Sequence, residues 1–252
     1  MIRCSEEHKK ITLDYLYKNK ELNLFMIGDI LNYGFDSKFQ TVFMDIDREI
    51  NSIYLIYRDN LVLSSNSSLI DKLFVSKLVD EFNIKNISGT KDIIDQLDNL
   101  KDWRKQECFF ASIKEIEKDV DTSIVENLKL EDTKKLVDAL NSVFNSETKI
   151  EVLEEEIKDE TARHYVIYNN DEIITHAGTS AECEGLAMII GVFTMFGFRK
   201  QHNALKCVSK LCSDLLNENK TPCLFYSNPD AAKMYKMLGF KDVGEYTLLK
   251  KG

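Results

Sequence analysis

The sequence predicts a mixed α/β protein in which helices pack around a sheet of parallel and antiparallel strands. Two observations carry this prediction. Short runs rich in Ile, Val, Tyr and Phe alternate with segments whose apolar residues recur at helical spacing. The run 186–194 is too uniformly apolar for a half-exposed strand, so we expect it in the centre of a sheet that is covered on both faces. Such an order of elements is typical of a layered α/β domain.

Residues 1–118 are expected to form one α/β domain. The second helix of this part ends at Gly34, a residue type that commonly terminates helices. Asn60 lies between two strand-like runs and predicts a hairpin. The expected helices are 5–18, 21–33, 69–82 and a short helix capped by Thr90, and the expected strands are 41–45, 52–57, 61–64, one around Ile87 and 107–113.

Residues 119–252 are expected to form a second domain after an acidic, poorly periodic linker, 114–122. The predicted order is strand, two helices, three strands, helix, strand, helix and strand. The expected strands are 124–128, 164–168, 172–178, 186–194, 222–226 and an edge strand at 243–249, and the expected helices are 131–144, 148–163, 203–217 and 229–238, the last ending at Gly239.

The charge of the chain is acidic overall but uneven. A net charge of −9 disfavours a nucleic-acid partner, because phosphate contacts need a basic face. Residues 185–213 nevertheless contain no Asp or Glu, while Arg199, Lys200, Lys206 and Lys210 all fall in this window. The window suits a small polyanionic ligand. The alternative is one basic face of a helix with no ligand.

The apolar segments predict no membrane span and no export. The longest of them, 186–198, is shorter than the ~20 residues that a transmembrane helix needs. The N-terminus, MIRCSEEHKK, has no apolar core of a signal peptide, so we expect a cytoplasmic protein. The six cysteines form no CxxC pair and have no histidine at metal-ligand spacing. We therefore expect reduced thiols and no metal site.

Four segments of the second part, in this order and at this spacing, resemble the GNAT superfamily of acyl-CoA-dependent N-acyltransferases. They are HAGTSAE (176–182), IIGVFT followed by MFGFRKQHNA (189–204), CLFYSNPDAAKMYKMLGF (223–240) and EYTLLK (245–250). The resemblance implies a GNAT-like fold for 119–252, with acetyl-CoA as co-substrate. It is faint for residues 1–113, which we interpret as a second, degenerate GNAT-like half.

The resemblance also implies a pyrophosphate-binding loop at the start of a helix. In the family, a pattern Arg/Gln-x-x-Gly-x-Gly/Ala points backbone N–H groups at the phosphates. Arg199 fits the first position and Ala204 the last, but His202 replaces the middle glycine and Lys200 a further common glycine. The histidine either blocks the phosphate or, with Lys200, supplies charge in place of close backbone contact. The expected cofactor-binding residues are Val192, Phe193, Thr194, Arg199, Lys200, Gln201, His202, Asn203, Ala204 and Asn228.

Two catalytic residues are expected from the same alignment. Tyr235 matches the family tyrosine that protonates the departing CoA thiolate, although a buried helix tyrosine is also a common packing residue. Glu182, and less so Glu184, lies just before the central strand, where a carboxylate could take the proton of the amine. The alternative for both glutamates is a solvated turn.

The function implied is acyl transfer from acetyl-CoA to a small amine by direct attack in a ternary complex. The alternative is a non-catalytic acyl-CoA-binding or interaction module that retained the fold after losing the loop glycines. A homodimer is one assembly state that the sequence leaves open.

Overall fold

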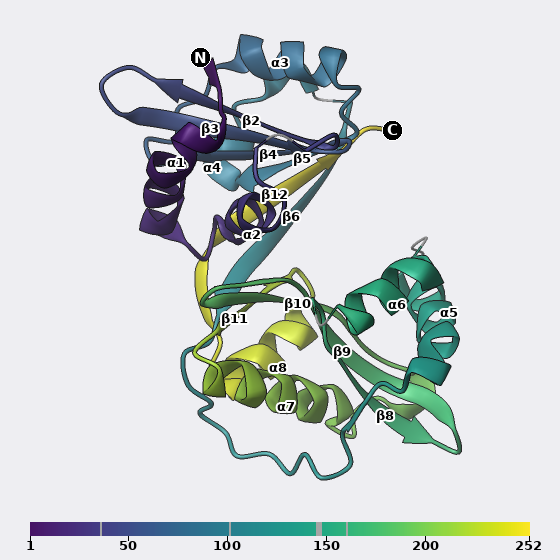
Figure 1. The fold of residues 1–252 in the computed structure, drawn as a ribbon. Coiled ribbons are helices and arrows are strands. Elements are labelled where there is room, and N and C mark those ends of the chain that lie inside the picture. The colour runs from purple at the N-terminus through teal and green to yellow at the C-terminus, as the bar shows by residue number, and fades with distance from the viewer. Residues whose placement is uncertain (36, 101, 145–147, 160) are drawn as a thin grey trace. The chain divides into compact units, whose positions relative to one another are not determined.

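The structure, a computed structural model, describes residues 1–35, 37–100, 102–144, 148–159 and 161–252. These residues divide into two compact units, Met1–Phe110 with Asp242–Gly252, and Ala111–Lys241 (Figure 1). The sequence predicted one break between residues 118 and 119. In the structure the closing strand is grouped with the first unit. Among the described residues, no helix combines the length and the apolar character that crossing a membrane requires.

The first unit contains a sheet with helices around it. Its strand order is β1-β2-β3-β4-β5-β12-β6, so β12 lies between two strands. The predicted edge strand at 243–249 is therefore an interior strand, and the prediction of an edge was wrong. The elements are β1 (Ile2–Arg3), α1 (Lys9–Leu16), α2 (Leu24–Tyr33), β2 (Gln40–Ile46), β3 (Ile50–Tyr57), β4 (Asn60–Ser65), α3 (Lys72–Glu81), β5 (Asn86–Thr90), α4 (Lys91–Ile94), β6 (Arg104–Ser112) and β12 (Lys241–Lys250).

The second unit has the order β11-β10-β9-β8-β7 in its sheet. The predicted order of elements is confirmed. The elements are β7 (Glu126–Asn127), α5 (Thr133–Phe144), α6 (Ile150–Lys158), β8 (His164–Asn169), β9 (Glu172–Cys183), β10 (Leu186–Thr194), α7 (Asn203–Asn217), β11 (Thr221–Tyr226) and α8 (Pro229–Leu238). The helix predicted at 148–163 is shorter than expected, and its residue 160 lies outside the described residues. No helix or strand occupies 114–122, and this segment is grouped with the second unit, which begins at Ala111.

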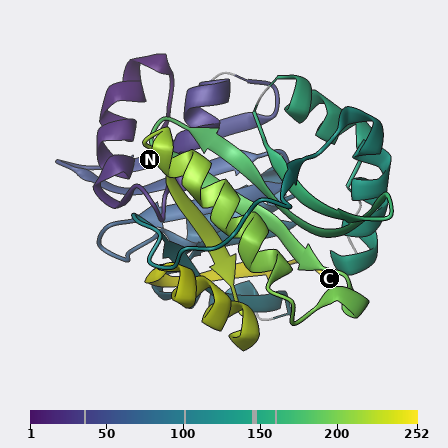
Figure 2. The ribbon, with the colours of Figure 1, turned by 90° about the horizontal axis from the view of Figure 1, so that it is seen from below.

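Helices cover both faces of the second sheet. Buried residues of α7, including Leu205, Val208 and Leu211, pack with Tyr165 and Ile167 of β8 in one core. Figure 2 shows α7 crossing the strands on this face. On the other face, buried leucines of α5 and α6 pack in a separate core, whose strand residues are Val166, Ile173 and Phe193. Neighbouring residues of β8 thus enter opposite cores, as the alternation of side chains along a strand requires.

Helix α8 shows why its bounds could be predicted residue by residue. The side-chain oxygen of Asn228 accepts a hydrogen bond from the backbone N–H of Asp230, and Pro229 occupies the first turn. The helix ends at Gly239, whose φ is 118°. A Cβ at this position would lie 2.7 Å from the carbonyl oxygen of Glu115, so only glycine fits.

The two halves of the chain, β1 to β6 and β7 to β12, share one order of elements. From β1 to β6, and again from β7 to β12, the chain runs strand, two helices, three strands, helix, strand, helix, strand. In each case the third of the three consecutive strands pairs in parallel with the strand after the next helix, β4 with β5 and β10 with β11. This repetition supports the interpretation of the first part as a second copy of the same fold.

Candidate functional site

Strands β10 and β11 separate halfway along β10. Their parallel pairing runs from Leu186 with Thr221 to Ile189 with Leu224 and then stops. The side of β10 that faced β11 is unpaired from Ile190 onwards, within the described residues. The strand also becomes more accessible here, since Ile190 is 40% exposed whereas Leu186 to Ile189 are buried. An open backbone edge of this kind can pair with an extended ligand.

A β-bulge lies at the same place on β10. The antiparallel register with β9 shifts between Ile190, which pairs with Gly178, and Phe193, which pairs with His176. Gly191 and Val192 have no registered partner, and Gly191 has a φ of 62°, a conformation that favours glycine. A Cβ on Gly191 would also approach the Leu140 and His176 side chains to 3.1 Å. The sequence therefore needs glycine at the point where the two strands part.

Two buried histidines lie against this bulge. The Nδ1 atom of His176 is 2.7 Å from the carbonyl oxygen of Gly191, and its Nε2 atom is 3.0 Å from Nδ1 of His164. Burial lowers the pKa of His176 to about 3, with a further contribution from His164, and burial lowers the pKa of His164 to about 4. Both imidazoles are therefore neutral at physiological pH.

The loop after β10 has a backbone suited to an anion. Lys200 and His202 adopt left-handed conformations, with φ of 65° and 60°, although neither is glycine. They stand at the two positions where the family pattern has glycines, so the loop keeps the conformation that glycine would take. A histidine at 202 is thus accommodated in the backbone at the energetic cost of a left-handed residue.

The backbone N–H groups of this loop and of the first turn of α7 lack hydrogen-bond partners among the described residues. Among the described residues, no hydrogen bond is made by the backbone N–H groups of residues 200–205. Left-handed residues and a helix N-terminus are both features that can direct N–H groups towards an anion. Lys206 and Lys200 lie in the same segment, and among the described residues no acidic side chain forms an ion pair with either. The predicted cofactor residues 199–204 are therefore brought together.

The side chains of the loop differ in role. The Nε atom of Arg199 donates to the Thr194 carbonyl oxygen at 3.1 Å, and the guanidinium lies over the exposed ring of Phe196. The buried Asn203 side chain donates to the Phe198 carbonyl oxygen and holds the loop on the helix. Gln201 and His202 are exposed. Arg199 thus remains at the loop with its terminal nitrogens uncommitted among the described residues.

The other residues predicted to bind the cofactor lie on β10 and at the start of α8, and most of them contact other parts of the protein. Phe193 and Thr194 pair with β9, and Phe193 packs beside His176, whereas Val192 lies in the bulge. Asn228 caps α8 with its side chain. Of these residues only Val192 lies in the unregistered part of β10.

Tyr235 is buried in α8 among aromatic rings. Its ring lies 6.0 Å from the ring of Tyr226 and 5.6 Å from the ring of Phe240. Within the described residues, no group hydrogen-bonds its hydroxyl. Burial raises the pKa of Tyr235 well above its ordinary value, with a smaller contribution from Cys212. The phenol therefore stays protonated over the physiological range.

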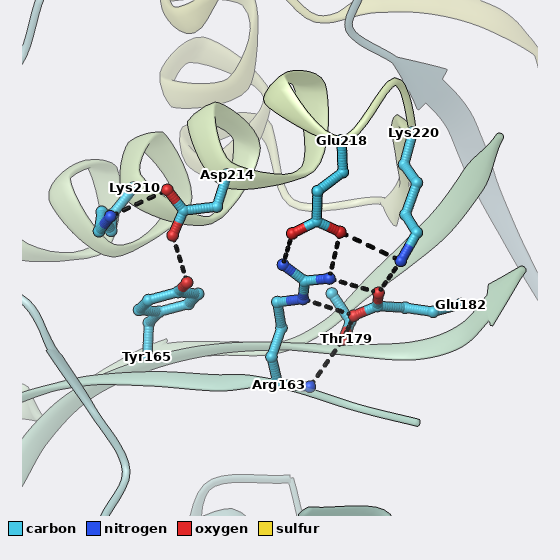
Figure 3. Close-up of polar contacts among 8 residues, drawn as sticks. All are labelled: Arg163, Tyr165, Thr179, Glu182, Lys210, Asp214, Glu218 and Lys220. Carbon is cyan, nitrogen blue, oxygen red and sulfur yellow. Dashed lines mark hydrogen bonds and ion pairs between the residues drawn. The ribbon is translucent and has the colours of Figure 1, made fainter. Parts of the chain in front are cut away.

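Glu182 is committed to an ion-pair cluster rather than exposed in a turn (Figure 3). Its side chain is 5% exposed, and Arg163 contacts both carboxylate oxygens at 2.9 and 2.8 Å. Lys220 lies 2.8 Å from the same carboxylate, and Thr179 donates a hydrogen bond to it. Burial acts to raise the pKa of Glu182, but Arg163, Lys220 and Thr179 outweigh it and lower the pKa.

The position of Glu182 also separates it from the loop. Arg163 bridges Glu182 to Glu218, the residue that follows α7, whereas the anion-binding loop precedes α7. A helix of 15 residues is about 22 Å long, so these two sites lie at opposite ends of it. The structure does not bring Glu182 together with the loop, and its contacts disfavour the predicted role of general base. Glu184 is an exposed turn residue.

Sequence reasoning missed the two histidines at the bulge. Taken singly, His164 and His176 gave no signal, because they are 12 residues apart and on different strands. A signal for the bulge was present, since an isolated glycine inside a strand pattern often marks one, and Gly191 is such a glycine.

Comparisons with known proteins agree with this geometry. Residues 158–249 match the sequence profile of the GNAT acetyltransferase family. Two solved GCN5-related N-acetyltransferases share the fold: one from Kribbella flavida (12% identity, TM-score 0.64, covering 93% of this chain and 95% of that one) and one from Sphaerobacter thermophilus (13% identity, TM-score 0.61, covering 90% and 84%). A Drosophila protein is also similar (10% identity, TM-score 0.69, covering 99% and 98%). No curated protein matched the chain.

The parted parallel strands and the β-bulge lie within the segment that matches the family. Residues 158–249 therefore form a domain similar to the GNAT acetyltransferase family, and the fold of the solved GNAT structures extends over most of the chain.

Proposed function

We propose that this protein transfers an acetyl group from acetyl-CoA to a small amine, by direct attack within a ternary complex. The observation that carries the proposal is the presence of two open backbone stretches in one segment. The unpaired side of β10 beyond Ile189 is followed, after the 3-10 turn Phe196–Phe198, by a loop whose N–H groups at 200–205 have no partner among the described residues. An elongated ligand with an amide-bearing arm and a pyrophosphate matches both features.

Anchoring of the cofactor falls to the loop and the start of α7. The N–H groups of residues 200–205 would receive the pyrophosphate, and the dipole of α7 favours negative charge there. Arg199, Lys200 and Lys206 add positive charge, which the Asp121 carboxylate offsets in part at Lys206. The left-handed Lys200 and His202 support this assignment, because they preserve the backbone shape in the absence of glycine.

Polarisation of the thioester falls to the bulge. Val192 has no registered partner on either neighbouring strand, so its N–H group is the donor that we assign to the thioester carbonyl. A fixed backbone donor stabilises the charge that develops on this oxygen during attack.

Tyr235 is the group that we assign to protonation of the departing thiolate. A phenol whose pKa is raised by burial remains protonated until the thiolate forms. Its hydroxyl has no competing partner among the described residues. The proton of the amine passes to solvent in this proposal, because Glu182 is held by Arg163 and Lys220.

The first unit is, in this proposal, a degenerate copy that does not bind acyl-CoA. Helix α3 corresponds to α7 in the order of elements, but its N-terminus is capped by the Asp71 carboxylate, which accepts from the N–H of Phe74. A carboxylate in this position takes the place of a phosphate and repels one. We also place the protein in the cytoplasm, because all six cysteines are free, buried thiols.

Calorimetric titration with acetyl-CoA, followed by a thiol-release assay on a panel of amines, tests the proposal. Saturable binding with amine-dependent thiol release supports it. Binding without thiol release for any amine supports the alternative, a non-catalytic acyl-CoA-binding module, and the absence of binding contradicts both.

A further inference from the structure

We infer that His176 and His164 are positioning residues that fix the orientation of the Gly191–Val192 peptide and so aim the Val192 N–H group at the acyl site. This inference rests on the proposed function, because the acyl site is the one described above. Neither histidine forms a hydrogen bond to the edge of β10 that faced β11. Both act through the backbone of the bulge, Gly191 and Val192.

Hydrogen bonding determines which nitrogen of each ring carries a proton. The Gly191 carbonyl oxygen can only accept, so Nδ1 of His176 must donate across the 2.7 Å contact. A neutral imidazole then has an acceptor at Nε2, and Nδ1 of His164 must donate to it at 3.0 Å. The remaining atom, Nε2 of His164, is a buried acceptor without a partner among the described residues. The two rings therefore form a one-directional chain of donors that ends on Gly191.

The geometry of the Gly191–Val192 peptide relates the direction of the Gly191 carbonyl to the direction of the Val192 N–H group. No described peptide bond is cis, so the carbonyl of Gly191 and the N–H of Val192 point in opposite directions. The side chain of His176, a residue of β9, holds this carbonyl. The Val192 N–H then points away from the His176 imidazole, in a part of β10 whose side towards β11 is unpaired among the described residues.

The surrounding residues leave room for this pair and little freedom to move. A Cβ on Gly178 would lie 2.6 Å from Nδ1 of His164 and 2.9 Å from Nε2 of His176. The two imidazoles lie nearly parallel with centroids 5.2 Å apart, and Phe193 covers His176. Gly178 on β9 and Gly191 on β10 thus leave space for the two imidazole rings. A core made only of apolar side chains would not require these two glycines.

Labelling can observe this one peptide in the full-length protein. The chain contains a single Gly–Val dipeptide, 191–192, so ¹³C-carbonyl glycine combined with ¹⁵N valine gives one correlated resonance. Labelling the four histidines with ¹⁵N reports the protonated nitrogen of each ring. His176→Leu removes the donor at similar volume, while His176→Asn keeps a donor near the position of Nδ1. His164→Leu and His164→Asn form the same matched pair one step further from the bulge.

We expect a proton on Nδ1 of His176 in the unaltered protein, and a shift of the Val192 resonance on addition of acetyl-CoA. His176→Leu should displace this resonance and lower kcat ten- to a hundredfold, with KM for acetyl-CoA changed less than twofold, and His176→Asn should restore most of both. His164→Leu removes the donor to Nε2 of His176 but leaves the Nδ1 proton on the Gly191 carbonyl oxygen, so it should displace the Val192 resonance by less than His176→Leu does. The thermal midpoint of each variant separates these effects from unfolding.

A proton on Nε2 of His176 in the unaltered protein overturns the inference. An unchanged Val192 resonance in folded His176→Leu overturns it too. If His176→Leu does not fold, an unchanged Val192 resonance in folded His164→Leu serves as the same test. An unchanged kcat in folded His176→Leu overturns it as well. If the unaltered protein releases no thiol with any amine, the proposed function fails. In that case, the Val192 resonance and its response to acetyl-CoA still test whether the histidines orient the Gly191–Val192 peptide, independently of catalysis.

Discussion

Arg163 and Glu182 form a bidentate ion pair in the second unit. The Nε atom of Arg163 donates to Oε1 of Glu182 at 2.9 Å, and Nη2 donates to Oε2 at 2.8 Å. Arg163 precedes β8, and Glu182 is near the end of β9. Glu218 and Lys220 extend the pair into a cluster of alternating charges at the C-terminal end of α7. The cluster joins α7 to the end of the sheet where β10 and β11 remain paired.

Glu182→Gln should reduce stability but not catalysis. The substitution leaves Arg163 and Lys220, each 24% exposed, facing a neutral amide, and we expect a loss of about 3 kcal/mol, the lower end for broken buried ion pairs. Turnover per folded molecule should remain within twofold of the unaltered protein, because the cluster lies far from the loop. Denaturant unfolding and a rate assay on one preparation measure both. A large fall in turnover of the folded variant would restore Glu182 as a catalytic base.

The same cluster predicts a loss of stability in acid. Hydrogen bonding to Arg163, supported by Lys220, lowers the pKa of Glu218 from 4.5 to about 2 and outweighs the opposing effect of burial. A lowered pKa in the folded state stabilises the protein above pH 4.5, and this contribution is lost as the pH falls towards 2. The free energy of unfolding of Glu218→Gln should therefore fall less steeply over this range than that of the unaltered protein. Equal slopes would show that the cluster does not form in solution.

His202 provides a test of the loop conformation. His202→Gly relieves a left-handed side chain but adds freedom to the unfolded chain, so stability should change by less than about 1 kcal/mol. His202→Val should destabilise by about 1–2 kcal/mol and weaken acetyl-CoA binding, because a β-branched residue disfavours this φ. Gln201→Val, at the neighbouring exposed position without a positive φ, is the control. Equal effects of the two valine substitutions would argue against a left-handed residue at 202.

Arg199→Glu should weaken acetyl-CoA binding tenfold or more, since it replaces a phosphate partner with a like charge. Lys10→Glu makes the same change of charge on an exposed side chain of the first unit and should leave the dissociation constant unchanged. Titration calorimetry at one ionic strength compares the two. An unaltered dissociation constant for Arg199→Glu would exclude this loop as the phosphate site.

Most of the fold could be predicted from the sequence because its signals are local. The bounds of α7 and α8 were predicted to the residue, and for α8 the cap at Asn228 and the stop at Gly239 explain why. Strand β9 was predicted too short, since its last residues pair with the start of β10 across a turn and have no alternating pattern of their own. The position of β12 between β5 and β6 depends on contacts between distant segments, which periodicity does not report.

A candidate site could be proposed from the sequence where it follows one continuous segment. The loop 199–204 is such a segment, because its residues are consecutive and its departures from glycine can be read directly. The ion-pair partners of Glu182 could not be predicted, because Arg163 and Lys220 are 19 and 38 residues away in the sequence. The contact of His176 with Gly191 was invisible for the same reason.

Amine-dependent release of the CoA thiol tests the central claim most directly, measured with acetyl-CoA for the unaltered protein and for Tyr235→Phe. We expect saturable thiol release with at least one amine of the panel. We expect a ten- to thousandfold lower turnover in Tyr235→Phe, the usual effect of losing one general acid, with nearly unchanged acetyl-CoA affinity and thermal midpoint. Normal turnover in Tyr235→Phe beside a lowered midpoint would make this tyrosine a packing residue. Saturable acetyl-CoA binding with no thiol release from any amine would contradict the account and identify a binding module instead of an enzyme.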